Sequence, residues 1–260
     1  MPTAAYRPLP ITGPVYPDTL GPMRILVTGG TGYLGRELVA RGCLGVSRST
    51  GVDVRDEDAV RHALAGIDAV IHTAYVQDGP DAWSTNVAGS LAVARAARGL
   101  RLIHISTDVV FGGTKGEPYV EADPLDPVTD YGRSKAAAEA EVAREHPGAL
   151  IVRTSLIYGG AEPSKHELAA RDPANTFYTD EIRSPVQVGE LADRLLELLE
   201  TDLAGPLHLG GADAVSRREF AELVARRPVE GASSPPDRPK NCALGSTRVG
   251  PLRGVREVLL

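Results

Sequence analysis

The chain has 260 residues, 42% of them hydrophobic, which is enough to bury a sizeable core. Its 34 acidic and 28 basic residues give a net charge of −6, which argues against nucleic acid or an anionic membrane as a partner. Two cysteines make no disulfide framework, and no apolar run reaches the ~18 residues of a membrane span, so we expect a cytoplasmic protein.

The first 22 residues hold six prolines and lack the apolar segment of a signal peptide, so we expect 1–22 to be a flexible, proline-rich leader. From residue 24 onward, short apolar runs alternate with helical patterns. Strands are predicted at 24–30, 44–47, 69–74, 101–107, 149–159 and 205–211. Helices are predicted at 33–42, 56–66, 85–99, 134–146, 188–200, 216–227 and 255–260.

This alternation predicts an α/β protein with a doubly wound parallel sheet, the Rossmann fold, covered by helices on both faces. The pattern loosens after residue 159, where segment 160–185 is polar and interrupted by prolines. We therefore expect residues 23–157, joined by 185–211, to form an NADP-binding Rossmann domain. Residues 158–184 and 212–260 are expected to form a small, shortened substrate-binding subdomain.

A glycine-rich stretch at 29–35, GGTGYLG, lies between the first predicted strand and the first helix. The spacing of Gly29, Gly32 and Gly35 allows a tight turn and lets the backbone approach a pyrophosphate at a helix N-terminus. In this strand–turn–helix setting the motif is typical of a dinucleotide site. A turn that serves packing alone is the alternative.

The end of the second predicted strand indicates which dinucleotide binds, because an NAD site usually carries a carboxylate there. This chain has Ser47 and Arg48 at that place and no acidic residue. An arginine flanked by hydroxyls suits a 2′-phosphate, so NADP(H) is favoured and NAD(H) is the alternative. Asp53 is the candidate to face the adenine edge, and its neighbour Val54 is grouped with it as cofactor-binding.

Polar side chains follow the predicted strand 101–107, with Ser106, Thr107 and Asp108 at the end where open parallel sheets bind ligands. Downstream, Tyr131 and Lys135 have the i, i+4 spacing that places two side chains on one face of a helix. A cation held beside a phenol would lower the phenol's pKa and suit the pair to proton transfer. A tyrosine and a lysine on a helix surface are the alternative.

The histidines offer little for metal chemistry. None of the six has a cysteine or carboxylate at ligand spacing, so no metal site is expected, and His104 is interpreted as a core or sheet-face residue.

In chain order, these motifs resemble the extended short-chain dehydrogenase/reductases, and among them the dTDP-4-dehydrorhamnose reductase group. The resemblance covers nearly everything after residue 23. It rests on ILVTGGTGYLG (25–35), TNVAGSLAVA (85–94), HISTDVVFGG (104–113), EADPLDPVTDYGRSKAAAE (121–139) and LIVRTSLIYG (150–159).

The resemblance implies an NADP(H)-dependent reductase that transfers a hydride to a keto group of a nucleotide-linked sugar. It implies Thr107 as a catalytic hydroxyl, Tyr131 as the general acid and Lys135 as its partner, the last two also contacting the cofactor. Asn86 would support the site. The cofactor-binding residues would be Gly29, Gly32, Tyr33, Leu34, Gly35, Thr73 and Ala74, with the residues at 47, 48, 53 and 54. The substrate-binding candidates are Asp108, Val109 and Arg183.

The sequence departs from this group after Tyr158. The group has a longer stretch there, with a helix that contacts the nucleotide sugar, whereas the stretch from Tyr158 to Ser184 is short here. We therefore expect a smaller or more open pocket. Two other functions stay open: a non-catalytic NADP-binding regulator similar to the regulatory subunit of methionine adenosyltransferase, and a nucleotide-sugar epimerase or dehydratase. A homodimer is the assembly considered.

Overall fold

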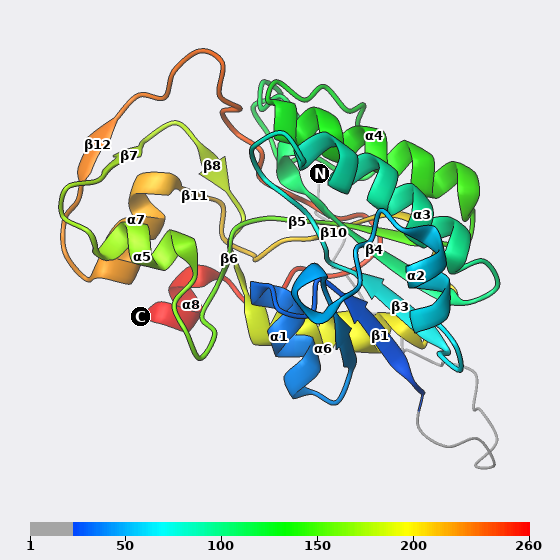
Figure 1. The fold of residues 1–260 in the computed structure, drawn as a ribbon. Helices are drawn as coiled ribbons and strands as arrows, with labels where there is room; N and C mark the ends of the chain where they lie inside the picture. The colour runs from blue at the N-terminus through cyan, green and yellow to red at the C-terminus, as the bar shows by residue number, and fades with distance from the viewer. Residues whose placement is uncertain (1–22) are drawn as a thin grey trace.

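The computed structural model describes residues 23–260, so the predicted leader 1–22 lies outside the described residues. In this part of the chain, a six-stranded sheet has the order β10-β5-β4-β3-β1-β2, with every pair parallel (Figure 1). This arrangement confirms the predicted doubly wound parallel sheet. The strands are β1 (Ile25–Thr28), β2 (Leu44–Val46), β3 (Ala69–His72), β4 (Arg101–Thr107), β5 (Leu150–Thr154) and β10 (Gly205–Leu209).

Helices cover both faces of the sheet (Figure 1). One face carries α1 (Tyr33–Ala40) and α6 (Val188–Leu199), and the other carries α2 (Glu57–Ala63), α3 (Ser90–Ala96) and α4 (Asp130–Glu145). A short π-helical segment, Ser84–Gly89, leads into α3. On α6, Leu191, Leu195 and Leu198 recur at helical spacing and are buried against the sheet. Burial of each such side chain contributes about 1.5–3 kcal/mol.

The predicted strand 149–159 is two strands in the structure. After β5 the chain leaves the main sheet, and β6 (Ile157–Tyr158) pairs with β9 (Val186–Gln187) instead. The break comes at Ser155, whose hydroxyl donates to Asp108 at 2.6 Å and accepts the N–H of Ser184 at 3.2 Å. The apolar sequence 149–159 does not by itself reveal these contacts, which hold the backbone in place where it leaves the sheet.

A second group of elements lies beside the sheet (Figure 1). Its buried side chains include Tyr158, Phe220 and Val255. Ser216 is the N-cap of α7 as predicted, accepting the N–H of Glu219 at 3.0 Å. The elements of this group are α5 (Lys165–Arg171), α7 (Arg217–Ala225) and α8 (Val255–Leu259), with the strand pairs β7 (Thr176–Tyr178)–β12 (Glu230–Ala232) and β8 (Ile182–Arg183)–β11 (Val215–Ser216).

The segment 160–185 is therefore more ordered than its composition suggests. A helix, α5, lies within this segment, and Ser164 caps it by accepting the N–H of Glu167 at 3.2 Å. The capping-box spacing from Ser164 to Glu167 is the sequence signal for this helix. The exact boundaries between Rossmann domain and subdomain stay a prediction. Across residues 23–260, no helix combines the length and apolar character needed to cross a membrane.

Candidate functional site

The glycine-rich stretch forms a tight loop between β1 and α1. Gly29 has φ +75°, and the N–H of Gly32 donates to the carbonyl of Gly29 at 2.8 Å. A Cβ on Gly35 would lie 2.1 Å from that same carbonyl oxygen, so a side chain cannot be accommodated there. No side chain caps the start of α1. Its first N–H groups are thus left for a ligand, and the loop fits a dinucleotide pyrophosphate.

The segment after β3 closes one side of this loop. A Cβ on Gly29 would lie 2.7 Å from the backbone nitrogen of Ala74 and 2.9 Å from Oγ1 of Thr73. The Thr73 hydroxyl donates to the carbonyl of Thr28 at 2.8 Å. Both predicted cofactor-binding residues therefore lie against the glycine loop.

The residues predicted to bind the adenosine part of the cofactor follow β2, and they do not line the cavity described in the next paragraph. Arg48 has a side chain that is 65% exposed, and its Nη1 lies 3.6 Å from Asp81. Asp53 is held by the guanidinium of Arg55, which lowers the pKa of the Asp53 carboxyl. Val54 is buried and packs beside Gly89, so its side chain faces the core. Ser47 forms a reciprocal cap with Thr50.

A cavity of about 500 Å³ opens at the carboxyl ends of the central strands. Tyr33 joins the glycine loop to the segment after β6, because its hydroxyl accepts the N–H of Gly160 at 2.8 Å. The structure brings together the residues predicted for catalysis and for substrate binding, with part of those predicted for the cofactor. The predicted residues that line the cavity are Gly32, Tyr33, Leu34, Gly35, Thr73, Thr107, Asp108, Val109, Tyr131, Lys135 and Arg183.

Tyr131 lies in the first turn of α4, which is capped by the hydroxyl of Thr129. Burial raises the pKa of Tyr131, Tyr75 and Asp108 raise it further, and the hydroxyl of Thr107 lowers it as a hydrogen-bond partner. Because desolvation is the largest influence, this pKa is raised, and the predicted lowering beside Lys135 is wrong for the protein alone. A phenol kept protonated at neutral pH is nevertheless what a proton donor requires.

Lys135 is buried, with 2% of its surface exposed, so the alternative of a surface lysine is wrong. Its Nζ donates to the carbonyl of Ile105 at 2.7 Å and lies 3.4 Å from Nε2 of His104. Burial lowers the pKa of Lys135 to about 8, partly offset by Glu139. His104 is a core residue as predicted, but its contact with Lys135 was not foreseen.

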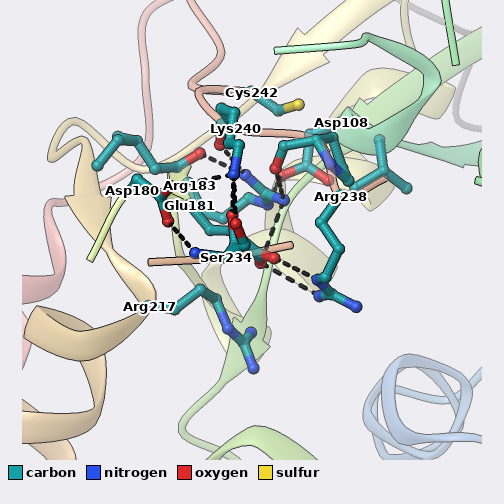
Figure 2. Close-up of polar contacts among 12 residues, drawn as sticks. Asp108, Asp180, Glu181, Arg183, Arg217, Ser234, Arg238, Lys240 and Cys242 are labelled. Carbon is teal, nitrogen blue, oxygen red and sulfur yellow. Dashed lines mark hydrogen bonds and ion pairs between the residues drawn. The ribbon is translucent and has the colours of Figure 1, made fainter. Parts of the chain in front are cut away.

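Asp108 and Arg183 face each other in the cavity wall, with Arg183 Nε 3.7 Å from a carboxylate oxygen of Asp108. Burial raises the pKa of Asp108, opposed by Arg183 and the Ser155 hydroxyl. The guanidinium of Arg183 also donates to backbone carbonyls at 2.7, 2.7 and 2.9 Å (Figure 2). Most of its N–H groups are therefore engaged within the protein.

Asn86 supports the site without lining the cavity. Its side-chain amide donates to the carbonyl of Val76 at 2.8 Å and to Oγ of Ser134 at 2.9 Å. Its oxygen accepts the N–H of Val76 at 2.8 Å. The segment after β3 is thereby tied to α4, the helix that carries Tyr131.

Several cavity residues were missed because their segments carry no recognised motif. The start of α5 could have been placed from the capping box at Ser164, which would have brought two of them to a helix N-terminus. Within residues 23–260, no group of histidine, cysteine or carboxylate residues is arranged to hold a metal ion. The missed lining residues include Tyr75, Gln77, Ser155, Ser164, Lys165, His166, Glu181, Arg217 and Arg238.

Comparisons with known proteins agree with this geometry. A family model described as RmlD substrate binding domain matches residues 23–240. The dTDP-4-dehydrorhamnose reductase of Mycolicibacterium smegmatis is 37% identical over 246 residues, which cover 86% of this chain and 73% of that protein. Methionine adenosyltransferase 2 subunit beta of Rattus norvegicus is 29% identical, covering 91% of this chain and 87% of that protein.

The fold is also similar to that of a solved reductase. The crystal structure of dTDP-4-dehydrorhamnose reductase from Bacillus anthracis, in complex with NADP, matches with a TM-score of 0.82 and 26% identity. The match covers 91% of this chain and 97% of that chain.

Proposed function

The chain belongs to the RmlD substrate binding domain family, and from this premise we propose that it is an NADP(H)-dependent reductase of a nucleotide-linked keto sugar. The observation that carries the proposal is the convergence of Thr107, Tyr131 and Lys135 on one cavity beside the glycine loop. NADPH, when bound along that loop, supplies the hydride for the carbonyl carbon.

The side chains of the cavity would perform the proton half of the reaction. Tyr131 holds a proton on its hydroxyl at neutral pH and would deliver it to the developing alkoxide oxygen. Thr107 would orient the same oxygen through its hydroxyl. Lys135 is fixed by the carbonyl of Ile105, and its ammonium would stabilise the phenolate that Tyr131 leaves behind. Asp108 and Val109 would contact the sugar.

The test is NADPH oxidation, followed by absorbance, against a panel of dTDP- and UDP-linked 4-keto sugars. Loss of the Tyr131 hydroxyl in Tyr131→Phe should lower kcat by about 10²- to 10⁴-fold, the usual contribution of a general acid. Tyr158→Phe is the matched control, because the Tyr158 hydroxyl is buried, has no hydrogen-bond partner within residues 23–260 and does not line the cavity. Unchanged turnover in Tyr131→Phe would refute the assignment.

A regulatory protein is the second candidate, favoured by the similarity to the rat methionine adenosyltransferase subunit. NADPH binding without turnover on any sugar of the panel, together with a stable complex with another enzyme, would decide for it. Elimination chemistry is disfavoured, because dehydratases of this superfamily typically place a glutamate where Val109 follows Asp108. The cytoplasm and a homodimer stay predictions.

A further inference from the structure

Two histidines lie buried next to each other between the sheet and the helices α3 and α4. His72 on β3 and His104 on β4 are paired in the sheet, and their ring centroids are 5.2 Å apart. His72 is 1% exposed and His104 is fully buried. Burial of a polar ring is unfavourable unless its nitrogens form hydrogen bonds, so each ring needs an explanation.

The position of His72 is explained by its hydrogen bonds. Its Nδ1 lies 2.6 Å from Oγ1 of Thr28, and its Nε2 lies 2.9 Å from Oγ of Ser90. A hydroxyl can donate or accept, so both ring nitrogens are satisfied whichever of them carries the proton. His72 is therefore a structural residue that ties β3 to β1 and to α3.

His104 has a different environment. Its Nε2 lies 3.4 Å from Nζ of Lys135, whereas its Nδ1 is buried and has no hydrogen-bond partner within residues 23–260. Burial lowers the pKa of His104 well below its usual range, and Lys135 and His72 lower it further, so the ring is neutral. An ammonium can only donate, so Nε2 is the acceptor and the proton of the ring lies on Nδ1.

The unpaired Nδ1–H group is unfavourable for folding. Most buried polar atoms in folded proteins have a hydrogen-bond partner, and an apolar side chain at residue 104 would leave none unpaired. The feature that an imidazole supplies here, and a leucine would not, is the acceptor at Nε2. The group that uses this acceptor is the ammonium of Lys135.

Two acceptors on β4 hold the ammonium of Lys135. Its Nζ donates to the carbonyl of Ile105 at 2.7 Å and to Nε2 of His104 at 3.4 Å. An ammonium has three N–H groups, so one is left for the cavity that Lys135 lines. The titratable groups around Lys135 are His72 on β3, His104 on β4, and Tyr131 and Glu139 on α4.

We propose that His104 is a positioning residue, whose neutral imidazole accepts a hydrogen bond from Lys135 and keeps the remaining N–H of the ammonium directed at the cavity. The proposal rests on the reductase function, in which Lys135 stabilises the phenolate of Tyr131. It extends that function to a residue outside the cavity lining. Without an acceptor at residue 104, the ammonium form of Lys135 would be less favoured over the neutral amine.

The first test uses the wild-type full chain. Nitrogen NMR of protein labelled with ¹⁵N-histidine shows which ring nitrogen carries the proton. The signals of His104, identified by their loss in His104→Gln, should report a neutral ring with its proton on Nδ1 from about pH 5 to about pH 9. A proton on Nε2 in this range would overturn the proposal, because Nε2 could then not accept from Lys135.

The second test follows Lys135 by carbon NMR of the full chain labelled at Cε of lysine. In His104→Leu the pKa of Lys135, about 8 in the wild type, should fall by about one pH unit, because a hydrogen bond to the ammonium is lost. His104→Gln should restore most of this pKa, because its side-chain oxygen can accept. The lysine signals to be resolved are those of Lys115, Lys135, Lys165 and Lys240.

His72→Leu is the matched control. It removes an equally buried imidazole from the neighbouring strand, and that imidazole bonds Thr28 and Ser90. The pKa of Lys135 should therefore stay unchanged in this variant. An unchanged pKa of Lys135 in His104→Leu, or an equal fall in His72→Leu, would overturn the proposal.

Turnover separates this proposal from the reductase function. Reduction requires the ammonium, so the alkaline limit of kcat/KM should move to lower pH in His104→Leu as the pKa of Lys135 falls. A lower pKa without reduction of any keto sugar in the panel would refute the reductase and keep the role of His104. Reduction by His104→Leu with an unchanged alkaline limit would do the reverse. If circular dichroism shows that His104→Leu is unfolded, His104→Phe replaces it, because phenylalanine keeps a flat ring without an acceptor.

Discussion

Lys135 should make the free protein less stable while it serves the reaction. Its ammonium is buried with one backbone carbonyl as a strong partner, and burial lowers its pKa from 10.5 to about 8. Between these two values the unfolded chain binds more protons than the folded protein does. The free energy of unfolding therefore rises with pH across this window, and the destabilisation is fully present below pH 8.

The size of the effect follows from the two pKa values. Desolvation of Lys135 costs the folded state about 3 kcal/mol at pH 7 and about 1 kcal/mol at pH 10, because at pH 10 the folded protein has lost the proton that most unfolded chains still hold. Replacement by methionine removes this titration. Between pH 7 and pH 10 the wild type should thus gain about 2 kcal/mol of stability relative to Lys135→Met.

Urea unfolding of both proteins at the two pH values measures this change directly, and other titrating groups cancel in the comparison. Lys115→Met is the control, because Asp123 raises the pKa of Lys115 and no such rise with pH is expected. If wild type and Lys135→Met changed equally with pH, Lys135 would not be desolvated as described. Loss of reductase activity should accompany the substitution at either pH.

Two further substitutions test the cofactor site and the helix that carries Tyr131. Arg48→Gln should weaken NADPH binding by about 10-fold or more, because the 2′-phosphate loses a charged partner, and should leave the affinity for NADH unchanged. A fluorescence titration in which the affinity for both cofactors fell equally would contradict the assignment of Arg48. Glu139→Ala should cost about 3–5 kcal/mol in urea unfolding, because Arg153, whose side chain is 5% exposed, would lose its counter-charge. Glu141→Ala, which breaks an exposed pair on the same helix, should cost less than about 1 kcal/mol.

The sequence alone predicted those features of the structure whose pattern lies within one short segment. The strand 101–107 has the predicted bounds, because its apolar run ends where Thr107 begins a turn. The i, i+4 spacing of Tyr131 and Lys135 places both on α4. The glycine loop needed only its place between a strand and a helix to be recognised.

The missed features depend on contacts between distant parts of the chain. The strand after residue 149 breaks where the Ser155 hydroxyl donates to Asp108 and accepts the N–H of Ser184, and an apolar run does not encode these contacts. His104 and Lys135 meet only because β4 and α4 pack together. The same holds for Arg217 and His166, since nothing in either local sequence marks the other as its partner.

The short segment between Tyr158 and Ser184 has a consequence for the entropy of ligand binding. The hydrogen bond from Gly160 to Tyr33 fixes its start to the glycine loop, and β8 fixes its end beside β11. A shorter chain between two fixed points samples fewer conformations, so less disorder is lost when a ligand settles against it. The segment therefore needs little further ordering to hold Lys165 and His166 in place when a ligand binds.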